Sequence, residues 1–314
     1  MKSWLFIGPR LLAGIGQVTK RYSEIAEKCG YETEFVEMGQ PTKKSQYAKG
    51  FAFVLPLPQQ LDLVEQYASL CRDMMWMTIC ETETVNPAYG ILAKYKTLWV
   101  ASDFCQRVFA RQFPEIEWKV LHLYAEVPTI PRPVTPSPYV FYTIGNVIDP
   151  RKNIKGLVEA FLRCGFGSDA HLILKATCKE PVYWRVPNVT VINGLLSNED
   201  LEKVHAQSHC YVNCSHSEGV GMGAVEAALR SKPVIITDYG GLKEYVKTPW
   251  VVPCKIGPIG FDDFLFTKDL EWGHPDPAEL QKCLRDCFDK KVTEWDHAHT
   301  AGLMARVEDF FKQN

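Results

Sequence analysis

Short apolar runs alternate with helix-period segments along nearly the whole chain, and this alternation limits the fold more than any other feature. The first half begins with the apolar run Trp4–Ile7, a glycine turn and an amphipathic segment over Val18–Lys28. Two parallel strands need a long crossover connection between them, which is usually a helix. The alternation therefore predicts an α/β protein with parallel, doubly wound sheets.

The same pattern continues through the first half and resumes after residue 138. Ser102 is the expected N-cap of one helix, and the run Asp276-Pro277-Ala278-Glu279 is expected to start another. Further strands are expected at Glu32–Val36, Phe51–Leu55, Met75–Ile79, Thr97–Ala101, Lys119–Leu123, Tyr139–Ile144, His171–Ala176, Asn188–Ile192, His209–Asn213, Pro233–Thr237 and Val251–Pro253, and further helices at Gln59–Cys71, Ser102–Gln112, Ile154–Arg163, Ser197–Ala206 and Val292–Phe311.

A proline-rich segment, Pro128–Pro138, interrupts the alternation. Proline fits neither a helix interior nor a central strand, so the segment is a surface loop or an interdomain linker. We interpret it as a linker because regular alternation restarts beyond it. The predicted domains are residues 1–130, residues 139–290 and a C-terminal helix over 291–314, and two α/β halves imply a ligand-binding cleft between them.

Composition excludes several classes of protein. The net charge of −2 gives no global attraction for nucleic acid or an anionic membrane, although local basic patches stay open. The 11 cysteines form no Cys-x-x-Cys pair and are expected to be reduced thiols. The N-terminus is a poor signal peptide, and no apolar run is long enough to span a membrane. We expect a cytoplasmic protein, with peripheral membrane contact left open and oligomeric state unknown.

The stretch from Ser215 to Gly241, SHSEGVGMGAVEAALRSKPVIITDYGG, carries the strongest functional signal. A strand ends just before it and a helix begins within it, so its turn lies at the ligand edge of the sheet. Val220, Gly221 and Met222 stand where the helix begins, and a helix N-terminus with little side-chain bulk suits a phosphate. Ionised carboxylates accept hydrogen bonds from sugar hydroxyls, which gives Glu218 and Glu226 a purpose beside a phosphate. A lone glutamate here would ordinarily be a solvated surface residue.

Glu218 and Glu226, with Ser231-Lys232-Pro233-Val234-Ile235 and Gly240-Gly241 after them, resemble the family 4 retaining glycosyltransferases of the GT-B fold, also called glycosyl transferases group 1. Glu244 takes the place of a later acidic residue in that pattern. The resemblance implies two Rossmann-like doubly wound domains facing across a cleft, and a final helix that crosses back to the N-terminal domain. It implies that Glu218 contacts the donor sugar and that Glu226 binds the nucleotide ribose.

The segment Tyr142–Phe161 resembles the part of the family that grips the donor diphosphate. Lys152 matches the family lysine, and Gly145 matches the glycine before it. Asn146 stands where the family has an arginine, and Arg151 is expected to supply that charge. The alternative is that Arg151 and Lys152 form an ordinary exposed basic turn. Lys175 is either a further donor-site cation or a strand-edge lysine.

Three further sets of residues fit the resemblance more loosely. Gly14 and Gly16 resemble a Gly-x-Gly loop near the donor phosphates or acceptor, although Thr19 excludes a Rossmann dinucleotide fingerprint. Glu81, Thr82 and Thr84 resemble part of an acceptor-side loop, and Glu81 could instead be a structural cap. Trp272, Pro275 and Asp276 resemble a Trp-x-x-Pro-Asp segment of one subgroup. His216 is either a donor contact or a structural residue.

The resemblance implies transfer of a sugar, with retention, from a UDP- or GDP-linked donor to a hydroxyl acceptor. Arg151, Lys152 and the helix N-terminus would stabilise the departing diphosphate. The leaving phosphate oxygen would help to deprotonate the attacking hydroxyl, so neither a metal nor another cofactor is expected. Alternatives are a sugar-nucleotide epimerase of this fold, a non-catalytic nucleotide-sugar or glycan-binding module, and a glycosyltransferase acting on modified DNA bases. The near-neutral charge speaks against a nucleic-acid acceptor.

Overall fold

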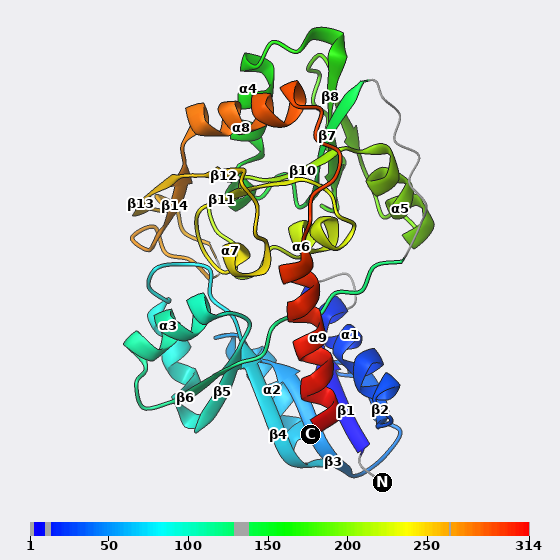
Figure 1. Cartoon of the computed structure of the whole chain (residues 1–314). Coiled ribbons are helices and arrows are strands. Elements are labelled where there is room, and N and C mark those ends of the chain that lie inside the picture. The colour runs from blue at the N-terminus through cyan, green and yellow to red at the C-terminus, as the bar shows by residue number, and fades with distance from the viewer. Residues whose placement is uncertain (1–2, 10–13, 129–137, 264, 314) are drawn as a thin grey trace. The chain divides into compact units, whose positions relative to one another are not determined.

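The chain divides into two compact units, each built around one parallel sheet (Figure 1). The computed structural model describes residues 3–9, 14–128, 138–263 and 265–313. The first unit comprises Met1–Ala125, Ile259–Leu270 and Gly302–Asn314, and the second comprises Glu126–Pro258 and Glu271–Ala301. Nearly all of the proline-rich segment Pro128–Pro138 lies outside the described residues.

The first unit contains a six-stranded sheet in the order β2-β1-β3-β4-β5-β6, in which neighbouring strands are parallel. Helix α3 begins after Ser102, whose side chain accepts a hydrogen bond from the backbone N–H of Cys105, as the sequence predicted. The elements of this sheet and its connections are β1 Ser3–Gly8, α1 Gly14–Lys28, β2 Glu32–Glu37, β3 Tyr47–Phe53, α2 Pro58–Ala68, β4 Cys71–Thr78, the 3₁₀ helix η1 Pro87–Lys94, β5 Thr97–Val100, α3 Asp103–Gln112 and β6 Glu117–Val120.

The second unit contains another six-stranded sheet, in the order β12-β11-β10-β7-β8-β9, again with parallel neighbours. Both units are therefore Rossmann-like α/β domains, as predicted. The elements are β7 Tyr139–Gly145, η2 Pro150–Lys152, α4 Ile154–Arg163, η3 Gly167–Asp169, β8 Ala170–Ala176, β9 Val189–Ile192, α5 Asn198–Gln207, β10 Cys210–Asn213, α6 Met222–Leu229, β11 Val234–Thr237, α7 Leu242–Tyr245 and β12 Val251–Val252.

A two-stranded antiparallel hairpin, β13 Cys254–Pro258 with β14 Glu271–Pro275, was not predicted. Glycine and proline occur in both strands, so neither has the alternating apolar pattern of a typical strand. Helix α8, Pro277–Asp289, follows the hairpin. The Asp276 carboxylate accepts hydrogen bonds from the N–H groups of Ala278 and Glu279, which confirms the predicted cap.

The last helix, α9 Ala298–Gln313, begins later than the sequence predicted, and residues 292–297 are not helical. From Gly302 onward it belongs to the first unit, where the Phe311 ring packs against the rings of Trp4, Phe6 and Tyr22. Residues 259–270, which the predicted range 139–290 placed in the second domain, also cluster with the first unit.

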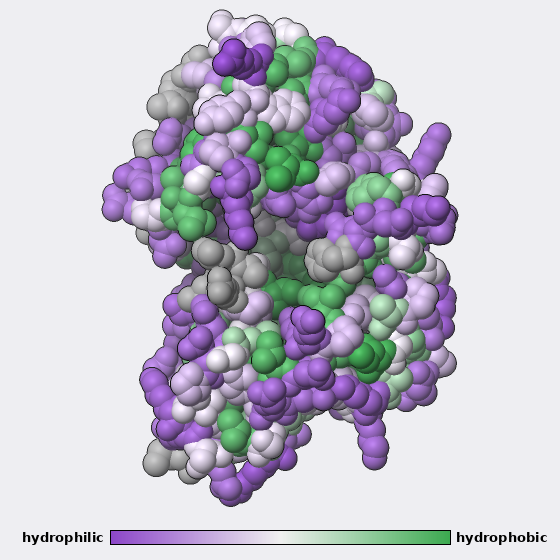
Figure 2. Space-filling view, turned by 180° about the vertical axis from the view of Figure 1, so that it is seen from behind, coloured by the Kyte–Doolittle hydropathy of each residue, from purple (hydrophilic) through white to green (hydrophobic). Residues whose placement is uncertain are grey.

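Each domain has an apolar core around its sheet, whereas hydrophilic and apolar residues are interspersed on the face drawn in Figure 2. The core of the second domain includes Phe141 on β7 and Leu172 on β8, both fully buried. All 11 cysteines are free thiols, and six of them are buried. Within the described ranges, no helix is both long enough and apolar enough to cross a membrane.

Candidate functional site

The candidate site lies where the strand order of the second sheet reverses. Strands β7 and β10 are neighbours, and from them β8-β9 and β11-β12 extend in opposite directions. Ligands of doubly wound sheets bind at the carboxyl ends of the strands at such a switch point. Lys152 follows β7 through the short helix η2, and Glu218 follows β10. The topology thus brings together two residues that are 66 positions apart in the chain.

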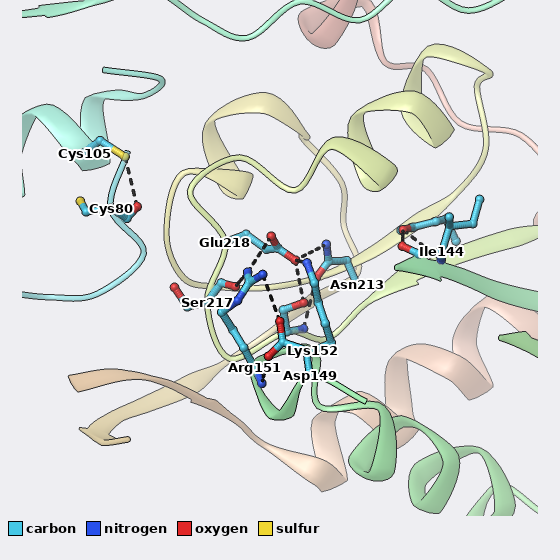
Figure 3. A network of polar contacts seen from close by, with 11 residues as sticks. Cys80, Cys105, Ile144, Asp149, Arg151, Lys152, Asn213, Ser217 and Glu218 are labelled. Atoms are coloured by element: carbon cyan, nitrogen blue, oxygen red, sulfur yellow. Dashed lines mark hydrogen bonds and ion pairs between the residues drawn. The ribbon is translucent and has the colours of Figure 1, made fainter. Parts of the chain in front are cut away.

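The Glu218 carboxylate is the centre of the site, and the residue is only 6% exposed. Its Oε1 accepts a hydrogen bond from Lys152 Nζ at 2.5 Å, and its Oε2 accepts one from Arg151 Nη1 at 3.2 Å (Figure 3). Ser215 Oγ donates to Oε1 at 2.8 Å and Asn213 Nδ2 does so at 3.4 Å. Both cations suggested by the sequence therefore contact the first glutamate. Sequence reasoning missed Asn213 and Ser215, whose types and spacing carry no distinct signal.

A compact turn holds the two cations in place. Asp149 Oδ1 caps this turn by accepting from the backbone N–H of Arg151 at 2.9 Å, and Asp149 Oδ2 pairs with Arg151 Nη2 at 3.3 Å. Arg151 Nη1 also donates to the carbonyl of Ser217 at 2.9 Å. The backbone N–H of His216 donates to the Arg151 carbonyl at 2.8 Å. The turn after β7 and the loop after β10 are thus bonded to each other through both main chain and side chains.

The two cations set the charge state of the buried glutamate. Burial alone would raise the pKa of the Glu218 carboxyl. The positive charges of Lys152 and Arg151, with the hydrogen bonds from Lys152 and Ser215, outweigh burial and lower that pKa from 4.5 to about 2. Glu218 is therefore an ionised acceptor at neutral pH. It has no proton to give as a general acid.

Glycines keep the floor of the site open. Gly221 is the N-cap of α6 with φ of 77°, and no side chain caps the helix N-terminus there. A Cβ added to Gly223 would lie 2.2 Å from the Tyr211 hydroxyl, so this position requires glycine. The resulting pocket is lined by Thr143, Ile144, Gly145, Lys152, Ile154, Tyr211, Val212, Asn213, Cys214, Ser215, Glu218, Gly221, Met222 and Gly223.

The Gly240-Gly241 pair after β11 contacts the backbone of Glu218. The backbone N–H of Gly241 donates to the Glu218 carbonyl oxygen at 3.0 Å. Gly240 has φ of 75°, and a Cβ there would lie 2.4 Å from the same carbonyl oxygen. The Gly-Gly pair therefore permits a close backbone approach that fixes the Glu218 loop, which the sequence pattern alone did not explain.

The other proposed donor residues are distributed unevenly around this pocket. Gly145 and Met222 line it, whereas Val220 is buried and Asn146 is exposed. Glu226 lies on α6, half-buried, outside the set of lining residues; its carbonyl accepts a hydrogen bond from Arg230 Nη1 at 2.8 Å. The structure therefore places Gly145 and Met222 against Lys152 and Glu218, and Glu226 on the helix that begins there.

The residues predicted in the first domain have separate surroundings. Gly14 and Gly16 belong to the first turn of α1, not to a loop before it, and residues 10–13 lie outside the described part of the chain. Glu81 and Thr82 line a small pocket together with Asn86, Tyr89 and Phe266. Thr82 is buried, and its hydroxyl donates to the Thr84 carbonyl at 2.7 Å, so these threonines brace the loop.

The histidine beside Glu218 packs against β14. His216 Nδ1 contacts the Gly273 carbonyl at 2.9 Å, and its ring stacks on Trp272 with centroids 5.1 Å apart. Burial lowers the pKa of His216. Among the residues that the structure describes, no three His, Cys, Asp or Glu side chains lie close enough together to hold a metal ion.

The comparison with known protein families matches the segment that contains Glu218 and Glu226. Residues 186–249, which include Glu218 and Glu226, match the family model described as Glycosyl transferases group 1. No curated protein sequence gives a significant match.

Several solved structures share the fold at low sequence identity. A glycosyltransferase from Rickettsia africae ESF-5 aligns with a TM-score of 0.61 at 12% identity, over 99% of this chain and 92% of that one. Sucrose-phosphate synthase from Thermosynechococcus elongatus gives 0.62 at 12% identity, over 100% and 94%. The pneumococcal O-GlcNAc transferase GtfA, in complex with UDP and GlcNAc, gives 0.54 at 13% identity, over 84% and 55%. The chain thus has the two Rossmann-like domains of GT-B glycosyltransferases, and the glycosyl transferases group 1 match covers the part of its candidate site that contains Glu218.

Proposed function

We propose that this protein is a retaining glycosyltransferase that moves a sugar from a nucleoside-diphosphate sugar to a hydroxyl acceptor. The observation that carries the proposal is the ionised, buried Glu218 held by Lys152 and Arg151 at the switch point of the second sheet. The group 1 family match and the fold support glycosyl transfer as the reaction class. The UDP in the O-GlcNAc transferase neighbour supports a UDP-linked donor, and GDP is the second choice.

The site suits a diphosphate leaving group. Lys152 and Arg151 supply two positive charges, and the N-terminus of α6 adds backbone N–H groups and the positive end of a helix dipole. Gly145 and Gly221 leave room for phosphate oxygens near the main chain. Negative charge develops on the diphosphate as the glycosidic bond breaks, so these groups bind the transition state more tightly than the ground state.

Glu218 orients the donor sugar in this proposal and is not a nucleophile. An ionised carboxylate accepts hydrogen bonds from sugar hydroxyls, and the same carboxylate keeps the two cations in place before the donor arrives. The acceptor hydroxyl would then attack from the side of the leaving phosphate, whose oxygen takes its proton. The new glycosidic bond forms as the bond to the diphosphate breaks, with retention and without a metal or another cofactor.

The remaining assignments complete the proposal. Glu226 would bind the ribose, Asn146 would lie beside the diphosphate, and Gly14 with Gly16 would contact the donor or acceptor from the first domain. Glu81, Thr82 and Thr84 would belong to the acceptor side. The free thiols support a reducing compartment such as the cytoplasm.

The test is a screen of nucleoside-diphosphate sugars for binding and then for turnover, with Lys152→Ala as the diagnostic variant. We expect Lys152→Ala to lower transfer by about 100-fold, because it removes one preorganised charge from the leaving group. The matched control is Lys155→Ala, three residues away on α4, where the side chain is 85% exposed; it should keep its activity.

Full transfer by purified Lys152→Ala would refute the site. Release of an epimerised donor without any acceptor would identify an epimerase, and donor binding without turnover across an acceptor panel would identify a binding module.

A further inference from the structure

One lysine in the second domain is buried, and its ammonium group donates to backbone carbonyls. Lys175 lies near the end of β8 and is 3% exposed. Its Nζ donates to the carbonyl of Ala176 at 2.6 Å and to the carbonyl of Gly194 at 2.6 Å. Burying an ammonium group costs free energy unless its hydrogen-bonding capacity is met.

The Lys175 ammonium group holds a turn at the edge of the sheet where ligands bind. Gly194 follows β9 and has φ of 80°, a conformation that disfavours other residues. The neighbouring Asn193 side chain accepts from the N–H of Val182 at 2.8 Å and donates to its carbonyl at 2.9 Å. The segments that follow β8 and β9 are thus tied to each other and, through Lys175, to the end of β8.

Two large apolar side chains in these segments face solvent. Tyr183 is 80% exposed and Leu195 is 74% exposed, more than any other large apolar side chain in the described part of the chain. Both belong to the segments that Asn193 joins. Leu195, on a turn that hydrogen bonds from Lys175 and Asn193 hold in place, is therefore available to contact a ligand.

The Gly194 turn lies along the same edge of the sheet as the pocket lined by Lys152 and Glu218. Gly145, which lines that pocket, pairs with Ala176 across β7 and β8, and the N–H of Thr177 donates to the Gly145 carbonyl at 2.9 Å. Strand β9 follows β8 in the sheet, so the Gly194 turn lies about two strand spacings, roughly 10 Å, from Gly145. A diphosphate in the pocket can therefore direct its nucleoside toward this turn.

We propose that Lys175 is a positioning residue that holds the Gly194 turn in the conformation that receives the nucleoside of the donor, with Leu195 offering apolar contact to the base. The proposal rests on the proposed function. Lys175 acts through the Gly194 carbonyl and not on the phosphates, which distinguishes it from Lys152.

Calorimetry with two probes tests this role. The first is the tightest-binding nucleoside diphosphate of a panel of UDP, GDP, ADP and CDP, and the second is inorganic pyrophosphate, which lacks a nucleoside. Lys175→Met should weaken nucleoside diphosphate binding by about tenfold, the effect of losing a charged hydrogen bond that shapes the turn. It should leave pyrophosphate binding unchanged. Glu226→Ala should show the same pattern, and Lys152→Ala should weaken both probes.

Two further variants keep the result interpretable. Lys232→Met removes another buried lysine, which donates to the Ser208 carbonyl at 2.5 Å; it should cost stability and leave both affinities unchanged. Gly194→Ala strains the turn through its φ of 80°, and the added Cβ meets no heavy atom within 4 Å, so the change introduces no clash. This variant decides the question if Lys175→Met does not fold. Gly194→Ala should weaken binding of the nucleoside diphosphate and leave pyrophosphate binding unchanged.

Equal losses for both probes in Lys175→Met, or no loss in either that variant or Gly194→Ala, would overturn the positioning role. If the wild-type protein binds pyrophosphate but no nucleoside diphosphate, this inference fails while the anion pocket stands. If it binds neither probe, the proposed function fails and this inference fails with it.

Discussion

At the scale of single residues, the site is a buried charge cluster centred on the Glu218 carboxylate. Two cations balance the carboxylate, while Ser215 and Asn213 complete its hydrogen bonding. Such a network stabilises the fold only while it is complete, because breaking a buried ion pair leaves uncompensated charge. The same groups would meet the donor, so local stability and activity depend on the same contacts.

Glu218→Gln should therefore change both activity and the pH dependence of stability. A depressed carboxyl pKa gives stability that is present above the unfolded pKa and is lost as pH falls through the folded pKa. The shift from 4.5 to about 2 corresponds to on the order of 3 kcal/mol. The wild-type advantage over Glu218→Gln in urea unfolding should thus be constant above about pH 5 and shrink toward pH 2. Transfer should fall by about 100-fold.

Glu65→Gln is the control for this measurement. Glu65 pairs with Lys94 and accepts from the Tyr95 hydroxyl at the surface of the first domain. An exposed pair contributes little, so its replacement should change stability by about 0.5 kcal/mol and leave transfer intact. A wild-type advantage over Glu218→Gln that does not vary between pH 5 and pH 2 would contradict the lowered pKa.

At the scale of elements, three loops make the site, and glycines decide how closely they approach. The turn after β7 carries the cations, the loop after β10 carries Glu218, and the Gly240-Gly241 turn after β11 contacts the backbone of Glu218. Because all three follow neighbouring parallel strands, the sheet sets their order and the glycines set their separation.

Gly240→Ala tests this arrangement. The residue has φ of 75° and its Cβ would lie 2.4 Å from the Glu218 carbonyl oxygen, so we expect a loss of about 2 kcal/mol or more. Transfer should fall as well, since Glu218 moves with its backbone. Gly302→Ala is the opposite case: it lies inside α9 with open space at the Cβ position and should gain about 0.5–1 kcal/mol. Thermal unfolding of both variants gives the comparison, and a neutral Gly240→Ala would refute the close approach.

At the scale of the whole molecule, the chain does not fold as two consecutive blocks. The first domain is completed by residues 259–270 and by α9 from Gly302 onward. Phe311, near the end of the chain, is fully buried and packs against rings on β1 and α1. The first sheet therefore buries part of its apolar face against residues that follow the second domain in the sequence.

Phe311→Ala should destabilise the first domain by about 3–5 kcal/mol, the typical effect of deleting a large buried ring. Hydrogen exchange would detect this as lost protection of the amides of β1, Ser3–Gly8, while the amides of β7, Tyr139–Gly145, keep theirs. An equal loss of protection in both strands would mean that the two units unfold as one.

The sequence by itself determined the two parallel sheets and most strand positions. It also singled out Lys152, Arg151 and Glu218 as site residues, which stays a prediction. Periodicity and caps are local properties, so Ser102 and Asp276 predicted their helices correctly. The sequence did not predict the hairpin β13–β14, the late start of α9 or the clustering of residues 259–270 with the first unit. Glycine, proline and amphipathic patterns do not say which surface a segment packs on.

Only the tertiary structure decided how the site is assembled. It brought Glu218 into contact with both cations, and it recruited Asn213, Ser215 and Asp149. It showed that Lys175 donates to the carbonyl of Gly194 and that His216 stacks on Trp272, two contacts that the sequence did not predict. The reason is that a motif fixes which groups are available along the chain, whereas the order of strands in the sheet fixes which loops become neighbours.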